Sequence, residues 1–256
     1  MTGSGTNTYV LGRGEGGVAV IDPGPSDRQH LESVTTAARR RGRPALVVLT
    51  HHHVDHAESA REVARALGVE LAAIPHRKGP RPDVALADRQ RLRLGGATLE
   101  VFATPGHCRD HACLRWGETG AVFTGDLIAG EGYIVVSPPD GDMADYLGSL
   151  RRLRRLRPVT LLPGHGPSIE DPDDYIKRYI DHRLEREAKV LAALDPDRWR
   201  GTLRLLPRVY GDTPVAAWPV ARRSLLAHLR KLVDEGRAEA DRGRYRRVAT
   251  SPPGAR

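Results

Sequence analysis

The stretch Val47-Val48-Leu49-Thr50-His51-His52-His53-Val54-Asp55-His56 places an apolar strand directly before four of the chain's eleven histidines. Histidine is the commonest metal ligand and is poorly suited to a core unless something uses its ring nitrogens. In an extended chain His51 and His53 point to one side and His52 points away. Asp55 and His56 follow in the turn just beyond and can face a second ion. The stretch therefore predicts a metal centre at the end of a strand.

Three more potential ligands follow predicted strands further along. They stand in Thr104-Pro105-Gly106-His107, Phe123-Thr124-Gly125-Asp126 and Leu162-Pro163-Gly164-His165-Gly166. Because a mixed sheet collects strand ends along one edge, these groups can converge on the first cluster. Five imidazoles and two carboxylates suit two zinc ions better than one four-coordinate structural site. Ligand histidines also need a partner for the second ring nitrogen, and Asp22 at an earlier strand end is a candidate.

The rest of the pattern predicts an α/β fold. Apolar runs between glycine-rich turns indicate strands, and capped amphipathic stretches indicate helices. Mixed sheets covered by helices on both faces would bury these runs. The expected elements are a hairpin over 6–22, a helix over 26–41, strands over 45–49 and 68–74 around a helix over 57–67, hairpins over 91–103 and 112–124, a helix over 143–156, a strand over 159–162 and a helix over 172–194.

The C-terminal quarter reads as a second, smaller module. After Asp195-Pro196-Asp197, two helices near 203–210 and 218–235 precede a basic hairpin over 236–248, which is a winged-helix pattern. Residues 201–256 carry 12 Lys+Arg against 5 Asp+Glu, whereas residues 1–150 carry 16 against 18. Such asymmetry suits a polyanion or an acidic partner, with self-solvating arginines as the alternative. We expect domains over 1–195 and 196–256.

Composition excludes several classes. With 39% hydrophobic and 28% charged residues, the 256-residue chain is expected to be globular rather than disordered or fibrous. No apolar stretch approaches the roughly 20 residues of a transmembrane helix. The N-terminal residues lack the pattern of a secretory signal, so we expect a cytoplasmic protein with Cys108 and Cys113 reduced. A monomer and a homodimer both fit the sequence.

The complete set of candidate ligands resembles the metallo-β-lactamase superfamily. This resemblance implies an αββα sandwich over residues 6 to about 194. It also implies that one metal takes His51, His53 and His107, that the other takes Asp55, His56 and His165, and that Asp126 bridges them. Zinc β-lactamases generally have a cysteine in the place of Asp126, so antibiotic hydrolysis is not expected. The iron-dependent persulfide dioxygenases do not use a histidine like His165 as a ligand.

A closer resemblance is to the β-lactamase-like protein 2 group, which combines this domain with a C-terminal winged helix. It rests on Asn7-Thr8-Tyr9, Ile21-Asp22-Pro23-Gly24, Pro163-Gly164-His165-Gly166-Pro167 and Tyr179-Ile180-Asp181-His182-Arg183. Members include a single-strand-specific endoribonuclease and thioesterases that act on carrier-bound polyketides. Two departures affect the expected substrate shape: Glu58-Ser59 stand where small glycines are usual, and Cys108 replaces a usual threonine.

These observations predict a hydrolase with two zinc ions per chain, in which a metal-bridging hydroxide is the nucleophile. Asp55 would be the catalytic residue that orients the hydroxide and takes its proton. We expect His111 to contact substrate or to hydrogen-bond behind the ligands. His182 and Arg183 are candidate substrate contacts along a polyanion path, with salt bridges inside their own helix as the alternative.

The favoured substrate is single-stranded RNA, because the basic tail adds charge where a nucleic acid could use it. Acyl thioesters on a carrier or on glutathione are the alternative. A nucleic-acid-binding regulator dominated by the winged helix is a third possibility, and the complete ligand set argues against it.

Overall fold

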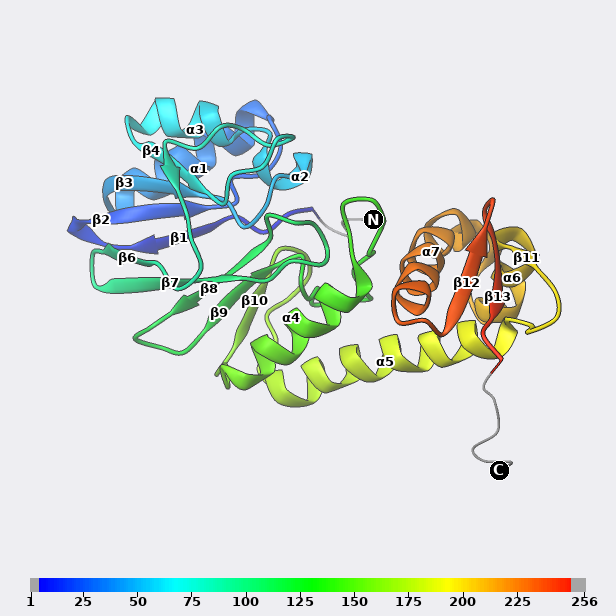
Figure 1. Ribbon diagram of the computed structural model, residues 1–256. Coiled ribbons are helices and arrows are strands. Elements are labelled where there is room, and N and C mark those ends of the chain that lie inside the picture. The colour runs from blue at the N-terminus through cyan, green and yellow to red at the C-terminus, as the bar shows by residue number, and fades with distance from the viewer. Residues whose placement is uncertain (1–4, 250–256) are drawn as a thin grey trace.

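The structure is a computed structural model that describes residues 5–249. Two sheets face each other between outer helices, and a small α/β domain follows at the C-terminal end (Figure 1). The expected αββα sandwich with a winged helix is therefore confirmed. The outermost parts of the two predicted domains, residues 1–4 and 250–256, lie outside the described residues.

The first sheet carries the N-terminal strands and the first ligand cluster. Its order is β1 (Tyr9–Gly12), β2 (Gly14–Ile21), β3 (Gly42–Val48), β4 (Glu70–Ala73) and β5 (Val84–Ala85). β1 is antiparallel to β2, and the other neighbours are parallel. Helices α1 (Arg28–Arg41) and α3 (Ala60–Leu67) pack on its outer face. Burial on both faces explains the near-continuous apolar runs of β2 and β3.

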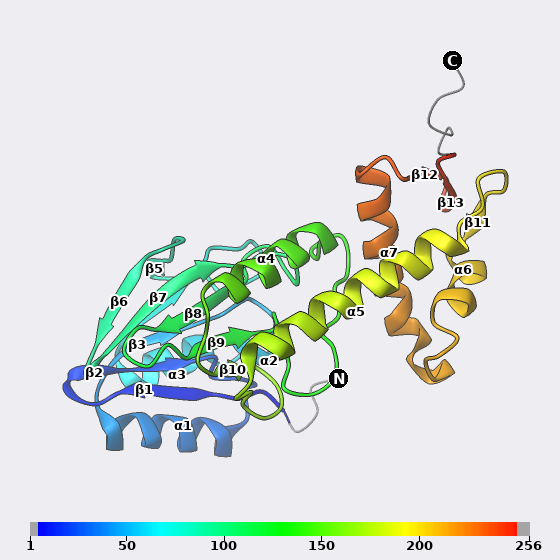
Figure 2. The same cartoon turned by 90° about the horizontal axis from the view of Figure 1, so that it is seen from below.

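The second sheet is mainly antiparallel. Its order is β10 (Leu161–Pro163), β9 (Val122–Gly125), β8 (Ala112–Trp116), β7 (Ala97–Ala103) and β6 (Arg91–Leu94), with only β10 and β9 parallel. Helices α4 (Met143–Arg155) and α5 (Pro172–Ala193) run along its outer face (Figure 2). Between the two sheets, Ile21, Val48 and Leu114 belong to a core with almost no solvent exposure.

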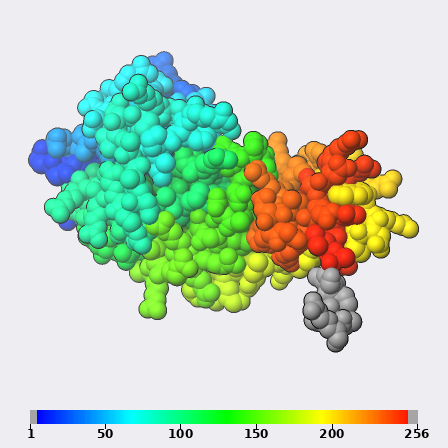
Figure 3. Space-filling view, in the orientation of Figure 1, coloured from blue at the N-terminus to red at the C-terminus, as the bar shows by residue number. Residues whose placement is uncertain are grey.

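The winged-helix domain has its own core. It contains β11 (Arg200–Gly201), α6 (Thr202–Val209), η1 (Val215–Ala217), α7 (Trp218–Asp234), β12 (Ala238–Asp241) and β13 (Arg244–Arg247). α5 contributes Ile176 to the core of the sandwich and Val190 to that of the winged helix. The domain boundary after residue 195 stays a prediction, because one helix serves both cores. Figure 3 shows the C-terminal domain lying directly against the sandwich.

Several elements differ from expectation in detail. The helix expected over 57–67 is two helices, α2 (Val54–Ala57) and α3, because the Ser59 N–H and hydroxyl both donate to Gly24 O at 3.1 and 2.9 Å and hold the chain at the junction. Asp55 therefore lies in α2 and not in a turn. The last strand of the second sheet begins at Leu161, since Val159 is 62% exposed. Within residues 5–249 no helix is long and apolar enough to cross a bilayer.

Candidate metal centre

The first three candidate ligands meet where β3 ends. His51 follows that strand, His53 precedes the first residue of α2, and His107 stands in the β7–β8 loop. His53 Nδ1 lies 3.1 Å from His51 Nε2 and 2.8 Å from His107 Nε2. One nitrogen from each ring lies within 4.8 Å of the others, so a single ion can reach all three.

Asp55, His56 and His165 form a second group of the same kind. His56 Nε2 lies 3.2 Å from His165 Nε2, and His165 Nε2 lies 3.3 Å from Asp55 Oδ2. His56 is fully buried, whereas the Asp55 side chain is 38% exposed. The second group therefore opens to solvent through Asp55.

Asp126 lies between the two groups. Its Oδ1 is 3.3 Å from His165 Nε2 and 3.4 Å from His56 Nε2, and its Oδ2 is 3.5 Å from His107 Nε2. The Oδ1 atom is buried and has no hydrogen-bond partner among the described residues. A buried carboxylate oxygen without a partner is costly unless a cation occupies the space before it. The structure thus brings together all seven residues that the sequence offers as ligands.

The outer nitrogens of four ligand rings are held by fixed partners. Each of these contacts joins Nδ1 of the ring to an oxygen 2.9–3.0 Å away. The partner of His51 is Thr50 Oγ1, that of His56 is Asp22 Oδ2, that of His107 is Val135 O and that of His165 is Gly5 O. Because Val135 O and Gly5 O can only accept, His107 and His165 carry their proton on Nδ1 and turn the Nε2 lone pair inward. Inward lone pairs this close repel unless a cation lies among them. The donor set therefore fits divalent metal ions.

The electrostatics of the cluster agree with this fit. Burial, followed by the charge of neighbouring imidazoles, lowers the pKa of His51 well below its usual value and that of His53 to about 4. Burial also opposes charge on His56, but Asp22 and Asp126 raise the pKa of His56 to about 10. The two carboxylates thus favour positive charge at this point of the cluster.

Asp22 organises the start of the cluster. Its carboxylate accepts hydrogen bonds from the Thr50 N–H at 2.7 Å and the Thr50 hydroxyl at 2.6 Å, besides its contact with His56. Asp22 has a φ of 48°, a conformation that few residues other than glycine adopt. The turn at the end of β2 thus places the Asp22 carboxylate against the outer nitrogen of His56 and, through the Thr50 hydroxyl, near that of His51.

His111 does not line the substrate side. Its ring is fully buried, Nε2 accepts from the Asp126 N–H at 3.0 Å, and Nδ1 lies 2.9 Å from Thr104 Oγ1. Burial lowers its pKa to about 3, which keeps the ring neutral. Of the two roles expected for His111, these contacts agree with a hydrogen bond behind Asp126 and not with a substrate contact.

Arg183 is a second correction. It is 3% exposed, donates to Ile134 O, and lies over the rings of Tyr133 and Tyr146 at 5.6 and 5.3 Å. It cannot line a polyanion path, because this face of α5 is buried against the loop before α4. His182 is partly exposed and stacks on Tyr133 with the ring centroids 3.6 Å apart, so its contact with substrate stays a prediction.

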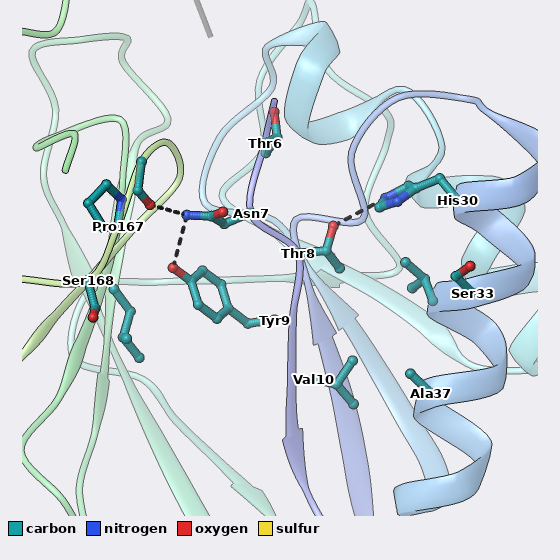
Figure 4. Close-up of a pocket in the computed structure, with 13 residues that line it drawn as sticks. Thr6, Asn7, Thr8, Tyr9, Val10, His30, Ser33, Ala37, Pro167 and Ser168 are labelled. Carbon is teal, nitrogen blue, oxygen red and sulfur yellow. Dashed lines mark hydrogen bonds between the residues drawn. The ribbon is translucent and has the colours of Figure 1, made fainter. Parts of the chain in front are cut away.

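The sequence motif around Asn7 has a structural role that its spacing did not reveal. The Asn7 side-chain amide donates to Pro163 O at 3.0 Å and Gly166 O at 2.8 Å, on either side of His165. Figure 4 shows Asn7 between Tyr9 and the loop of Pro167, at the edge of a cavity of about 600 Å³. Asn7 therefore fixes the loop that carries a ligand. An asparagine before a strand gives no signal of this kind.

The two cysteines are not among the seven candidate ligands, although Cys108 Sγ lies within 4.8 Å of ring nitrogens of His52 and His53. Cys108 and Cys113 are free and buried. Burial raises the pKa of Cys113 to about 12 and raises that of Cys108 still more strongly. Neither thiol can supply a nucleophilic thiolate near neutral pH.

Fold and site together define a metal-dependent hydrolase of the αββα class with an appended winged helix. Residues 1–165 match the model of the metallo-beta-lactamase superfamily, and residues 202–246 match the beta-lactamase associated winged helix domain. The chain belongs to the metallo-beta-lactamase superfamily.

Relatives and solved structures agree with this membership. The chain is 34% identical over 259 residues to the "Beta-lactamase-like protein 2 homolog" of Drosophila melanogaster, covering 93% of this chain and 85% of that protein. It is 34% identical over 192 residues to the "Atrochrysone carboxyl ACP thioesterase" of Aspergillus fumigatus, covering 74% and 60%. A metallo-beta-lactamase family protein from Thermus thermophilus shares the fold with a TM-score of 0.79, at 23% identity over 94% and 93% of the two chains.

Proposed function

We propose that the protein is a zinc-dependent thioesterase that acts on acyl groups held by a carrier. The observation that carries the hydrolase part is the convergence of five imidazoles and two carboxylates, with the outer nitrogen of four of the imidazoles held by a fixed partner. Histidine-rich nitrogen and oxygen donors suit zinc. The name of the Aspergillus relative supports the choice of a thioester.

The chain's own residues have distinct tasks in such a reaction. His51, His53 and His107 would hold one ion, Asp55, His56 and His165 the other, and Asp126 both. Ions bound there would lower the pKa of water and polarise the carbonyl oxygen of the thioester. As water attacks the thioester carbon and the C–S bond breaks, the Asp55 carboxylate oxygen that does not face His165 would orient that water, accept its proton and pass it to the departing thiolate.

Single-stranded RNA is the second candidate substrate, and one surface of the winged helix favours it. A cavity of about 480 Å³ lies between the terminal hairpin and α6, and Trp199, Arg204 and Arg222 are among its lining residues. Arginines beside an aromatic ring suit a nucleotide. Other arginines near the wing are already engaged: Arg246 pairs with Glu239 at 2.7 Å, and Arg237 pairs with Glu187 at 2.9 Å. These pairs weaken the case for RNA.

A substrate panel tests the proposal directly. Zinc-loaded protein would be assayed on an acyl-pantetheine thioester, a hydroxyacyl-glutathione and single-stranded RNA, with Asp55→Asn as the inactive control. We expect thioester hydrolysis that Asp55→Asn reduces at least about a hundredfold. Cleavage of RNA alone would replace the thioesterase with the second candidate.

A further inference from the structure

Three loops enclose a cavity of about 420 Å³ that none of the ligand residues lines. They are the β4–β5 loop, the β7–β8 loop and the segment before α4. The lining residues are His76, Arg77, Lys78, Arg109, Pro139 and Asp140.

The cavity adjoins the first ligand group on two sides. Arg109 comes two residues after His107, so their Cα atoms are at most about 7 Å apart. On the other side, a Cβ added to Gly79 would lie 2.8 Å from the Cβ of His52, which stands between two ligands in the sequence. A group bound in this cavity therefore lies beside the reacting centre and outside it.

Buried polar contacts hold the three loops together. Asp140 accepts from Lys78 Nζ at 2.8 Å and lies 3.5 Å from His52 Nε2 and 3.7 Å from His76 Nε2. His52 Nδ1 lies 2.7 Å from Asp110 Oδ1, and both side chains are at most 7% exposed. His52 thus contacts two of the residues that line this cavity, His76 and Asp140, from the side of the ligands. These contacts tie the three loops to one another.

Two cations at the cavity have no partner of their own. Asp140 offsets the charge of Lys78, but Arg77 and Arg109 are exposed and form no ion pair with any residue from 5 to 249. Arg109 acts on Asp145 only at longer range. A guanidinium binds phosphate oxygens in pairs, so two guanidinium groups at one cavity suit a phosphate group.

We propose that this cavity binds the phosphodiester by which a phosphopantetheine arm is joined to its carrier, while the thioester at the other end of the arm lies at the metal centre. This inference rests on the proposed thioesterase function. The arm has about thirteen bonds between phosphorus and sulfur and spans at most about 15 Å, which is enough to connect two adjacent sites. An RNA phosphodiester offers the same group, but an RNA strand also needs unpaired cations along its length. Near the terminal hairpin of β12 and β13, Arg237 and Arg246 are already paired with carboxylates.

The test compares two substrates that differ only in the phosphate. Zinc-loaded wild type, the double variant Arg77→Gln/Arg109→Gln and the control Arg40→Gln, an exposed arginine of α1, would be assayed on acyl-pantetheine 4′-phosphate and acyl-pantetheine. We expect the double variant to raise KM for the phosphorylated substrate about tenfold with kcat unchanged. KM for acyl-pantetheine should stay the same, and Arg40→Gln should behave as wild type.

Other results overturn the inference. Equal changes with both substrates, or no change with either, would show that the cavity does not bind the phosphate. If wild type hydrolyses neither thioester, the proposed function fails, and the cavity is judged by titration with pantetheine 4′-phosphate against pantetheine. Tighter binding of pantetheine 4′-phosphate than of pantetheine by wild type, lost in the double variant, supports the site. Equal binding of the two compounds by wild type overturns it. Impaired RNA cleavage with unchanged thioester kinetics would assign the cavity to RNA.

Discussion

Asp126 is the residue on which a two-ion centre depends, because its two oxygens face different ligand groups. We expect wild type to hold two zinc ions per chain and His165→Ala to hold one. Asp126→Ala should weaken the binding of both ions, since it removes a ligand from each. Metal content by mass spectrometry after dialysis measures this, with His182→Gln as a histidine control outside the ligand groups. One ion in fully loaded wild type would contradict the two-ion centre.

Asn7 allows a finer prediction, because it touches the His165 loop and no ion. Asn7→Ala removes two hydrogen bonds to carbonyls on either side of His165. The second ion should then bind about 10- to 100-fold more weakly, while the first is retained. Competition with a chromogenic chelator gives both affinities. Tyr9→Phe, which loses one bond of 2.8 Å to Pro163 O, should have a smaller effect. Equal weakening of both ions would argue against a local role for Asn7.

At the scale of single residues, the sequence predicts the metal ligands better than the groups that hydrogen-bond to those ligands. The ligands are rare residue types in short motifs at strand ends, so chemistry alone identifies them. Two of their supports are the backbone carbonyls of Val135 and Gly5, which any residue type would offer. Arg183 was misplaced, and the two roles of His111 could not be told apart, for a related reason: which side of a ring or helix is buried depends on tertiary packing.

Among the elements, α5 is the one that joins the domains, and Glu187 is a buried polar contact between it and the winged helix. The Glu187 carboxylate is 7% exposed and lies 2.7 Å from Lys231 Nζ on α7 and 2.9 Å from Arg237. Burial opposes its ionisation, but His228 and Lys231 lower its pKa to about 2. Glu187 thus contacts both α7 and the start of the terminal hairpin, beside the pairs that Arg186 and Lys189 of the same helix form with Asp212.

Glu187→Gln should destabilise the protein by about 1–2 kcal/mol near neutral pH, since it removes the buried partner of Lys231 and Arg237 and leaves them only the more exposed Glu235. A lowered pKa contributes stability that is complete above the unfolded pKa of about 4.5 and is lost as the pH falls toward 2. The difference from wild type should therefore shrink between those values. Urea unfolding at several pH values measures it, with the exposed Glu185→Gln on the same helix as control. A difference independent of pH would show that ionisation of Glu187 is not the cause.

Most elements could be predicted because local turn chemistry marks their ends. The hairpin of β6 and β7 turns at Gly95-Gly96, and its register pairs Leu94 with Ala97, as the glycine pair indicates. The two-residue strands β5 and β11 could not be predicted, since only their pairing with β4 and β13 defines them. A break such as that between α2 and α3 depends on a contact with Gly24, which is distant in sequence.

At the scale of the whole molecule, positive charge is concentrated in the winged helix. Residues 201–256 carry 12 Lys+Arg against 5 Asp+Glu. Within the described part of this domain, the arginines at the cavity beside α6 include Arg204 and Arg222, which are exposed and form no ion pair. An excess of charge on one domain raises the encounter rate with an acidic macromolecule and has little effect on a small ligand.

This asymmetry gives the last prediction. If the winged helix attracts an acidic carrier, kcat/KM for a carrier-bound thioester should fall about tenfold between 50 and 500 mM salt, because screening shortens the Debye length from about 14 to 4 Å. The free acyl-pantetheine lacks charge and should show almost no salt effect. Arg204→Gln/Arg222→Gln should flatten the salt dependence of kcat/KM for the carrier-bound thioester and leave kcat/KM for acyl-pantetheine and the metal content unchanged.

Two other results would point elsewhere. If the same variant instead reduces binding to single-stranded RNA, and lowers the slope of log affinity against log salt by about 0.7 per lost contact, the basic domain contacts nucleic acid. Salt dependence that the variant leaves intact would place the attraction elsewhere on the molecule.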